Sequence, residues 1–108
     1  MKSSASDKLV QLDLNDPSFQ ENLFSLPKPD RHSALETLNK LRRMTWGQVY
    51  GDNGLKWEKI HSITLPTGVI AVYSLRITQS RRATAYRDGD AMCFISISPN
   101  HDATYGKR

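Results

Sequence analysis

The chain has 108 residues, of which 38% are hydrophobic and 24% charged, and fifteen Lys and Arg against eleven Asp and Glu give a net charge of +4. This length is typical of one modest core, so we expect residues 1–108 to form a single domain. One cysteine excludes an internal disulfide framework and a cysteine-based zinc site. The longest apolar stretches fall short of the roughly 20 residues of a membrane helix, and residues 1–12 carry no secretory pattern. We therefore expect a cytoplasmic protein with no membrane partner.

The positive charge is concentrated in the second half of the chain. Residues 1–54 hold seven basic and seven acidic side chains, whereas residues 55–108 hold eight basic and four acidic ones. Clustered arginine suits a polyanion, because its planar guanidinium binds phosphate oxygens in pairs. The alternative is a solvated surface charge that keeps a small protein soluble.

The first 26 residues contain an extension and a short helix. Residues 1–16 are polar and rich in Ser at the start, so we expect a flexible extension or an edge strand there. A helix is predicted over Asp16–Leu26, with Asp16 as the N-cap before Pro17. One side of this helix is expected to carry Phe19, Leu23 and Phe24.

A second, clearer helix is predicted after Pro27 and Pro29. Ser33 and Glu36 have capping-box spacing, so the helix is expected to begin near Ser33 and to run to about Trp46–Gly47. Apolar residues recur along it at three-residue steps and predict its buried face, namely Leu35, Leu38, Leu41 and Met44.

The second half is typical of a sheet. β-Branched and aromatic residues between turn signals predict strands at Trp57–Leu65, Val69–Ile77, Arg81–Tyr86 and Ala91–Ser98. Two helices before a meander of strands predict an α+β domain, in which two N-terminal helices pack on one face of a three- to four-stranded antiparallel sheet.

The expected hairpin at Asp88–Gly89 makes a prediction about two arginines. A tight turn that pairs Tyr86 with Ala91 places Arg81 and Arg82 on the same strand. Adjacent strand residues point to opposite faces, so one guanidinium must lie on the helix side and the other on the open face. Alternation alone does not decide which of the two arginines lies on the helix side.

Most signatures of catalysis are missing from the sequence. It contains no phosphate-binding glycine loop and no serine hydrolase signature, and His32, His61 and His101 have no metal-ligand spacing. We therefore expect no metal site and no cofactor. Cys93 lies inside a predicted strand and is interpreted as a small buried residue rather than a nucleophile.

Polar residues at the strand ends remain as candidates for chemistry. They are Lys56, Glu58, Lys59, His61, Arg76, Arg81, Arg82, His101 and Tyr105. Cleavage of RNA needs a base for the 2′-hydroxyl proton, a cation for the charge on the phosphate and an acid for the 5′ oxygen. Glutamate, arginine and histidine fill these roles without a metal.

Each candidate also has a simpler interpretation. Glu58 between two lysines is typical of a surface ion-pair residue, and His101 is typical of an exposed turn. Trp46 and Trp57 are more often packing residues than surfaces for base stacking. Tyr105 is equally consistent with an anchor for the C-terminal tail.

The stretch Leu55–Tyr105 resembles the RelE/YoeB/HigB-type toxins of bacterial type II toxin–antitoxin pairs. Leu55–Ile60 resembles the segment that leads into the central sheet of that family. Tyr73–Thr78 followed by Arg82–Tyr86 is similar to its next two strands, and Ser96–His101 with Tyr105 is similar to its ending. No single motif is diagnostic, and the order and spacing of these motifs carry the resemblance.

The resemblance implies a RelE-like fold and endonucleolytic cleavage of mRNA in the ribosomal A site. It assigns Glu58 as general base, Arg82 as the arginine that faces the scissile phosphate, and His101 as general acid. Substrate contacts are expected from Lys56, Lys59, Arg76, Arg81 and Tyr105. The implied partners are the ribosome with its rRNA, mRNA, and a cognate antitoxin protein.

The sequence departs from the family in two places, and two other functions stay open. The paired lysines of RelE-like members are replaced by Val72 and Ser74, and the first fifty residues match poorly. One alternative is a ParE-like inhibitor of DNA gyrase, which does not need Glu58 or His101. The other is a non-catalytic basic module that binds RNA or protein.

Overall fold

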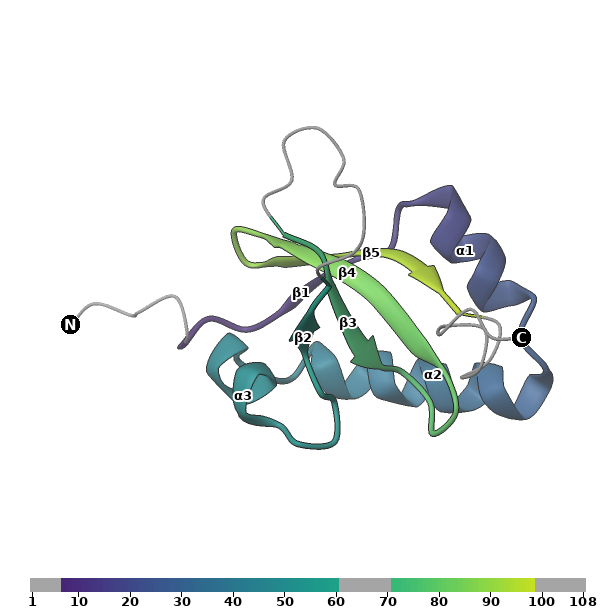
Figure 1. The fold of residues 1–108 in the computed structure, drawn as a ribbon, viewed down its shortest axis with the longest axis horizontal. Helices are drawn as coiled ribbons and strands as arrows, with labels where there is room; N and C mark the ends of the chain where they lie inside the picture. The colour runs from purple at the N-terminus through teal and green to yellow at the C-terminus, as the bar shows by residue number, and fades with distance from the viewer. Residues whose placement is uncertain (1–6, 61–70, 99–108) are drawn as a thin grey trace.

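The computed structural model of the protein describes residues 7–60 and 71–98, and the predicted α+β class is confirmed (Figure 1). In chain order, the elements of these residues are β1 (Gln11–Asp13), α1 (Pro17–Phe24), α2 (Lys28–Leu41), α3 (Trp46–Gly51), β2 (Glu58–Lys59), β3 (Tyr73–Arg76), β4 (Arg82–Asp88) and β5 (Ala91–Ile97). None of these helices is long and apolar enough to cross a membrane.

The sheet differs from the predicted antiparallel meander. It has five strands in the order β1-β5-β4-β3-β2, and β1 runs parallel to β5 while the other pairs are antiparallel. The expected edge strand near the N-terminus therefore exists, but it pairs with the last strand of the chain. Gln11 starts this pairing by donating its backbone N–H to the Asp90 carbonyl at 3.0 Å. The expectation of three or four antiparallel strands was wrong because it gave β1 no place in the sheet.

Helix α1 lies close to its predicted position. The Asp16 carboxylate accepts a hydrogen bond from the Ser18 N–H at 2.8 Å and caps the helix, as expected. Phe19 and Leu23 are buried, four residues apart on one face. Phe24 is 67% exposed, which corrects the prediction that it shares their side. One further step of about 100° turns its side chain away from the core.

Helix α2 begins at Lys28, five residues before the predicted start at Ser33. Pro29 lies in its first turn, where the missing N–H would have had no helical partner. The spacing of Ser33 and Glu36 therefore does not mark a cap. The buried face of α2 contains Ala34, Leu38 and Leu41, whereas Leu35, a predicted core residue, is 50% exposed.

Helix α3 is a separate element that the sequence pattern merged with α2. The longer helix ends at Leu41, and α3 begins after Thr45 with a capping box of its own. The Thr45 hydroxyl accepts from the Gln48 N–H at 3.2 Å, and the Gln48 side chain accepts from the Thr45 N–H at 2.9 Å. These reciprocal bonds satisfy two helix-terminal donors and start a new helix.

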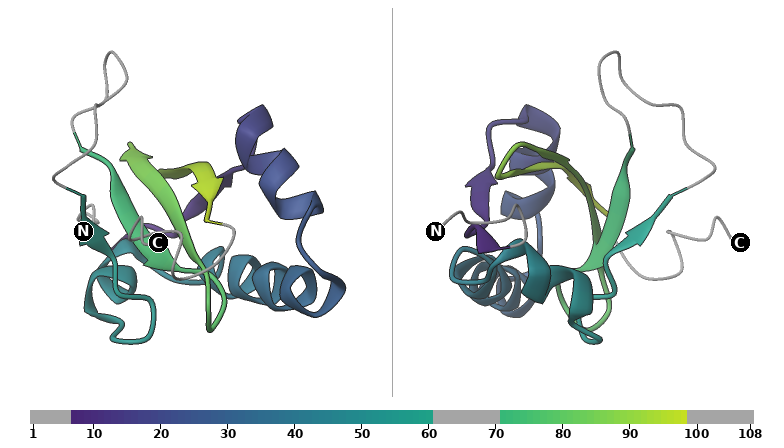
Figure 2. Two further views of the ribbon diagram at one scale, coloured as in Figure 1. Left: turned by 45° about the vertical axis from the view of Figure 1, so that its right-hand side comes forward. Right: turned by 90° about the vertical axis from the view of Figure 1, so that its left-hand side faces the viewer.

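The helices cover one face of the sheet, and the two layers share one core (Figure 2). Leu75, Ala83 and Phe94 project from the strands into this core among side chains of the helices. Trp46 is its largest fully buried side chain, and its indole N–H donates to the Asp90 carbonyl at 3.0 Å. α3 is thereby fixed to the β4–β5 hairpin.

The hairpin register differs from the predicted one by two residues. Asp88 pairs with Ala91, and Tyr86 pairs with Cys93 rather than with Ala91. The loop therefore holds Gly89 and one further residue, and Gly89 takes the positive φ of 62° that a tight hairpin turn requires. Near the turn, this shift of two residues leaves the side chains on their predicted faces. A β-bulge between Thr84 and Ala85 increases the difference to three residues, so that Thr84 pairs with Ser96 and Ala83 with Ile97.

We expect Trp46→Ala to lower the free energy of unfolding by about 3–5 kcal/mol, because it empties a fully buried site and removes one of the two hydrogen bonds to the Asp90 carbonyl. Urea denaturation followed by far-UV circular dichroism measures this change. Leu35→Ala is the control, since that side chain is half exposed, and we expect a change below about 0.5 kcal/mol. Equal effects of the two substitutions would contradict the assignment of Trp46 to the core.

Candidate functional site

The two adjacent arginines before and at the start of β4 lie on opposite faces of the sheet, as alternation requires. Arg81 is the one on the helix side, where its Nε and Nη2 atoms both lie 2.8 Å from the Asp30 carboxylate of α2. Arg82 points to the open face, away from the helices. The structure thus decides what the sequence pattern left open.

Arg82 is the central side chain of the open face. Only 11% of it is exposed, and its Nη2 atom donates to the Lys56 carbonyl at 3.0 Å and to the Ser74 hydroxyl at 2.9 Å. The Glu58 carboxylate lies 3.9 Å from the same nitrogen, and the Glu58 side chain is 66% exposed. A largely covered cation is therefore held mostly by neutral oxygens, with one accessible carboxylate beside it.

A second arginine lies next to Arg82. Arg76 of β3 is its direct cross-strand partner, and alternation places both side chains on the open face. Within residues 7–60 and 71–98, Arg76 makes no ion pair. Like charges directly opposite each other destabilise a sheet. We call Arg76 and Arg82 the arginine pair, and its unbalanced charge favours an anion at this face.

Hydroxyl groups continue the open face beyond the arginine pair. Ser74, Thr84 and Ser96 follow Glu58 in one row across the sheet, from β2 to β5. The Thr84 and Ser96 hydroxyl oxygens lie 2.6 Å apart, within hydrogen-bond distance. The row gives a bound chain hydrogen-bond donors and acceptors without adding charge.

The loop between α3 and β2 is shaped to meet the arginine pair. Lys56 has a positive φ of 52°, a conformation that is costly for any residue with a side chain. The Leu55 carbonyl accepts from the Arg76 N–H at 2.7 Å, and the next carbonyl, that of Lys56, accepts from Arg82. Two successive carbonyls thus bind both members of the arginine pair, and Glu58 follows two residues later.

Asp52 stabilises the same loop from its start, in the turn over residues 52–54. Its carboxylate accepts from the Gly54 N–H at 2.8 Å and the Leu55 N–H at 2.9 Å, and the Lys40 ammonium lies 3.4 Å away. The Leu55 hydrogen bond, followed by the charge of Lys40 and the Gly54 hydrogen bond, lowers the Asp52 pKa below its ordinary value of 3.8 against the opposing effect of burial.

The structure brings together four of the residues selected from the sequence, namely Lys56, Glu58, Arg76 and Arg82. It separates two others from them. Arg81 is bound to Asp30 on the helix side, and Lys59 follows Glu58 in β2 and therefore points to the opposite face. His61, His101 and Tyr105, which were also selected from the sequence, lie outside the described residues.

Sequence reasoning missed a cavity beside Glu58. It has a volume of about 370 Å³ and is lined by Tyr50, Asp52, Asn53, Lys56, Trp57 and Glu58. Tyr50 comes from α3, which the sequence pattern did not separate from α2. The spacing of Thr45 and Gln48, a threonine and a glutamine three residues apart, was the signal that would have predicted this helix.

Cys93 is unsuited to nucleophilic chemistry. It is buried, and its thiol lies 3.7 Å from the Asp13 carboxylate, which pairs with it across β1 and β5. Burial and then the negative charge of Asp13 raise the Cys93 pKa, and repulsion from the Cys93 thiolate raises that of its neighbour Tyr86. A thiol that keeps its proton is a weak nucleophile, which agrees with the interpretation of Cys93 as a buried structural residue.

No metal-binding group of three or more His, Cys, Asp or Glu side chains occurs in the part of the chain that the structure describes. Comparisons with known proteins add no assignment. No protein-family model matches the chain, and neither the curated proteins nor the solved structures give a significant match.

We expect Lys56→Gly to be more stable than Lys56→Val by at least about 1 kcal/mol, because valine is strained at positive φ and glycine is not. Lys59 gives a matched control, since it lies in a strand, where valine is favoured over glycine. Urea denaturation of the four variants measures both orders. The same order at both positions would contradict the left-handed conformation at Lys56.

Asp52→Asn should destabilise the protein in a pH-dependent way. Because the folded-state pKa of Asp52 is lowered, its carboxylate stabilises the protein fully above about pH 5, and this contribution is lost as the pH falls past 3.8 to the lower folded-state pKa. The difference between wild type and Asp52→Asn should therefore be large at pH 7 and shrink towards pH 3. Unfolding measured across this range tests it, and Lys40→Met should give a smaller difference, since Lys40 is the secondary cause. A constant difference from pH 7 to pH 3 would contradict the assigned role.

Proposed function

We propose that the protein is an endoribonuclease that cleaves mRNA by acid–base attack of a 2′-hydroxyl on the adjacent phosphate. The observation that carries this proposal is the arginine pair beside Glu58 on the open sheet face. RNA cleavage needs a cation at the phosphate and a base close to it, and Arg82 and Glu58 stand 3.9 Å apart.

The reaction begins when an RNA phosphate binds the arginine pair. Both donors of the Arg82 Nη2 atom are occupied by Lys56 and Ser74, whereas Nε and Nη1 make no hydrogen bond to residues 7–60 and 71–98. These two free donors lie on either side of the Cδ atom and do not share an edge, so each gives a single hydrogen bond to a phosphate oxygen. Arg76 adds a second positive charge where negative charge builds up in the transition state.

Glu58 acts as the general base. Its exposed carboxylate takes the 2′-hydroxyl proton, and the 2′ oxygen attacks the phosphorus. The bond from phosphorus to the 5′ oxygen breaks as an acid donates a proton to that oxygen. The products are a 2′,3′-cyclic phosphate and a 5′-hydroxyl end, so a proton leaves one oxygen and another reaches the leaving oxygen.

His101 is the proposed acid, because its imidazole donates a proton near neutral pH. It follows Ser98 by three residues in the sequence, and the Ser98 N–H donates to the Arg82 carbonyl at 2.9 Å. Three residues of chain span at most about 10 Å. Tyr105, four residues further on, is proposed to orient the substrate.

Ribosome dependence and antitoxin control belong to the same proposal. The resemblance of Leu55–Tyr105 to RelE/YoeB/HigB-type toxins supports them, as does the net charge of +4, which favours binding to ribosomal RNA. We propose that the protein acts on mRNA in the ribosomal A site and that a cognate antitoxin protein neutralises it.

A reconstituted translation reaction with a defined mRNA tests the proposal. We expect fragments with 5′ ends inside codons, mapped by primer extension, only when ribosomes are present. Glu58→Gln and His101→Gln should each slow cleavage by about 10²–10⁴-fold. Glu36→Gln and His32→Gln are the controls, because they make the same two types of substitution at exposed positions of α2. We expect both variants to cleave mRNA at the wild-type rate.

Two results would contradict the proposal. If mRNA stays intact in the presence of folded wild-type protein and ribosomes, the ribonuclease function is excluded. Gyrase-dependent DNA breakage then tests the alternative of a ParE-like gyrase inhibitor. Wild-type activity in Glu58→Gln and His101→Gln would remove the acid–base mechanism. If Glu58→Gln and His101→Gln change nothing and Arg82→Ala only weakens RNA binding, the protein is a non-catalytic RNA-binding module.

A further inference from the structure

The cavity beside Glu58 has the size and position of a ligand site. Its volume of about 370 Å³ is near the lower end of the range for small-molecule pockets, so it suits one ring system rather than an extended ligand. It shares Lys56 and Glu58 with the open-face site. A larger cavity of about 770 Å³ between α2 and α3 has no aromatic residue in its lining and does not touch Glu58.

Tyr50 gives this cavity an aromatic wall that is both exposed and fixed. The ring belongs to a side chain that is 52% exposed, yet its hydroxyl accepts a hydrogen bond from Arg87 Nη1 at 2.7 Å. Its ring centre lies 5.8 Å from that of Trp46, and the Arg87 guanidinium stacks 4.3 Å above the Trp46 ring. An exposed ring held by two partners loses little conformational entropy when a second ring stacks on it.

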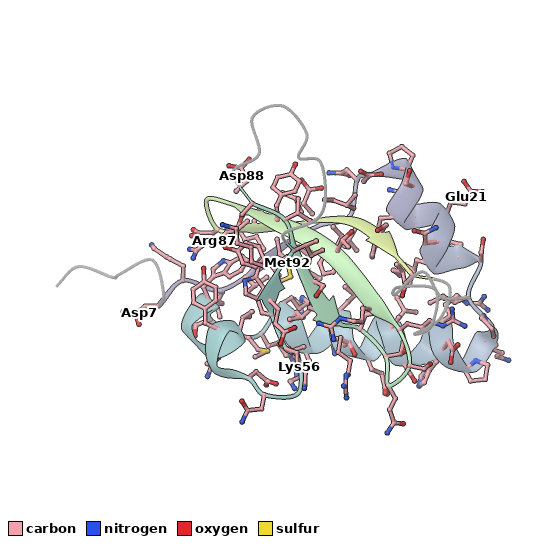
Figure 3. All side chains as sticks on the ribbon, viewed as in Figure 1. Asp7, Glu21, Lys56, Arg87, Asp88 and Met92 are labelled. Carbon is pink, nitrogen blue, oxygen red and sulfur yellow. The ribbon has the colours of Figure 1, made fainter. Side chains whose placement is uncertain are left out.

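Trp57 is held on another side of the same cavity. Its ring stacks on Tyr73 with centres 4.7 Å apart and meets Trp46 edge-on at 5.5 Å. Figure 3 shows Lys56 and Arg87 on the side of the molecule where α3 lies, far from Glu21 of α1. The aromatic side chains of the cavity, Tyr50 and Trp57, therefore lie at the α3 end of the sheet, next to the start of β2 with the candidate base Glu58.

The polar groups of the cavity match the edge of a nucleobase. Asn53 is exposed and makes no side-chain hydrogen bond to residues 7–60 and 71–98, so its amide offers a donor and an acceptor together. Lys56 adds a cation at the rim. A planar ring with hydrogen-bonding edges, attached to a phosphate chain, fits aromatic walls, one free amide and one ammonium.

We propose that this cavity binds a nucleobase of the RNA next to the phosphate held by the arginine pair. Its place in the reaction rests on the proposed ribonuclease function, whereas its binding of a base does not. Because Glu58 belongs both to the cavity and to the open-face site, a base that enters the cavity fixes the adjoining backbone beside the general base. The side chains of Tyr50, Asn53 and Trp57 then influence which bases flank the cut.

A binding measurement that needs no catalysis tests the cavity. The probes are the four 2′-O-methyl homotrinucleotides, which lack the nucleophilic hydroxyl, and the same probes with an abasic central position. Binding to the full chain is followed by the two tryptophan indole N–H resonances. We expect the Trp57 resonance to shift to saturation, while that of Trp46, which is bonded to Asp90 inside the core, shifts less.

The substituted proteins give the quantitative result. Tyr50→Ala and the abasic probe should each weaken binding by about 5- to 150-fold, because base–aromatic stacking is lost. Phe24→Ala is the matched control, since it removes an exposed aromatic ring from α1, outside the cavity, and we expect affinity within about twofold of wild type. Equal affinity of Tyr50→Ala and wild type, or of abasic and complete probes, would overturn the proposal.

The translation assay separates this inference from the proposed function. If wild-type protein leaves mRNA intact, the ribonuclease proposal fails, and the trinucleotide result still decides whether the cavity takes a base. If wild-type protein cleaves mRNA, Tyr50→Ala should change the distribution of bases beside the cuts and Phe24→Ala should not. An unchanged distribution together with unchanged trinucleotide binding would overturn the cavity alone.

Discussion

The pairing of Arg81 with Asp30 is the contact on which the arrangement of the site depends. Arg81 is 13% exposed, and a guanidinium that is largely removed from water needs a carboxylate with good geometry. Asp30 supplies that carboxylate from α2, 51 residues away in the chain. The bond therefore ties the helix layer to one face of the sheet, and strand alternation sends Arg82 to the face that the helices leave open.

Arg82 in turn fixes its own guanidinium relative to Glu58, the proposed general base. It donates to the Lys56 carbonyl, which faces it because Lys56 takes the left-handed conformation, and Glu58 lies two residues further along the same chain. The strain at Lys56 and the like charges of the arginine pair are both unfavourable by themselves. Such local conflicts are expected at functional sites, where the rest of the fold holds them in place.

Local signals in the sequence predicted the elements that depend on local chemistry. Asp16 before Pro17 marked the start of α1, Gly89 marked the hairpin, and the alternation of Arg81 and Arg82 predicted one charge on each face. The parallel pairing of β1 with β5 joins residues about 80 positions apart and leaves no local pattern. Leu35 was misplaced because a step of three residues deviates from the helical period of 3.6, so that the face defined by Ala34, Leu38 and Leu41 is the buried one.

The site was predicted in part for the same reason. Residue type alone selected Glu58, Arg76 and Arg82, since charged residues near strand ends are visible in a sequence. Alternation separates Lys59 from Glu58 and Arg81 from Arg82, but which member of each pair faces the helices depends on the final register and on the Asp30 contact, which are tertiary facts. The aromatic cavity was missed because it depends on α3, and its one local signal, the pair Thr45 and Gln48, was absorbed into a longer expected helix.

Strand β4 and the short helix α3 together couple the cavity to the core. A six-residue helix is not stable alone, so the position of Tyr50 depends on the burial of Trp46 one turn before it. Arg87 packs against both rings and belongs to the same strand as Arg82, on the opposite face. The side chains at the two ends of β4 therefore position the two parts of the proposed site, the anion site through Arg82 and the aromatic wall through Arg87. Glu58 and Lys56 lie between these two elements, which is where a nucleotide would join its base to its phosphate.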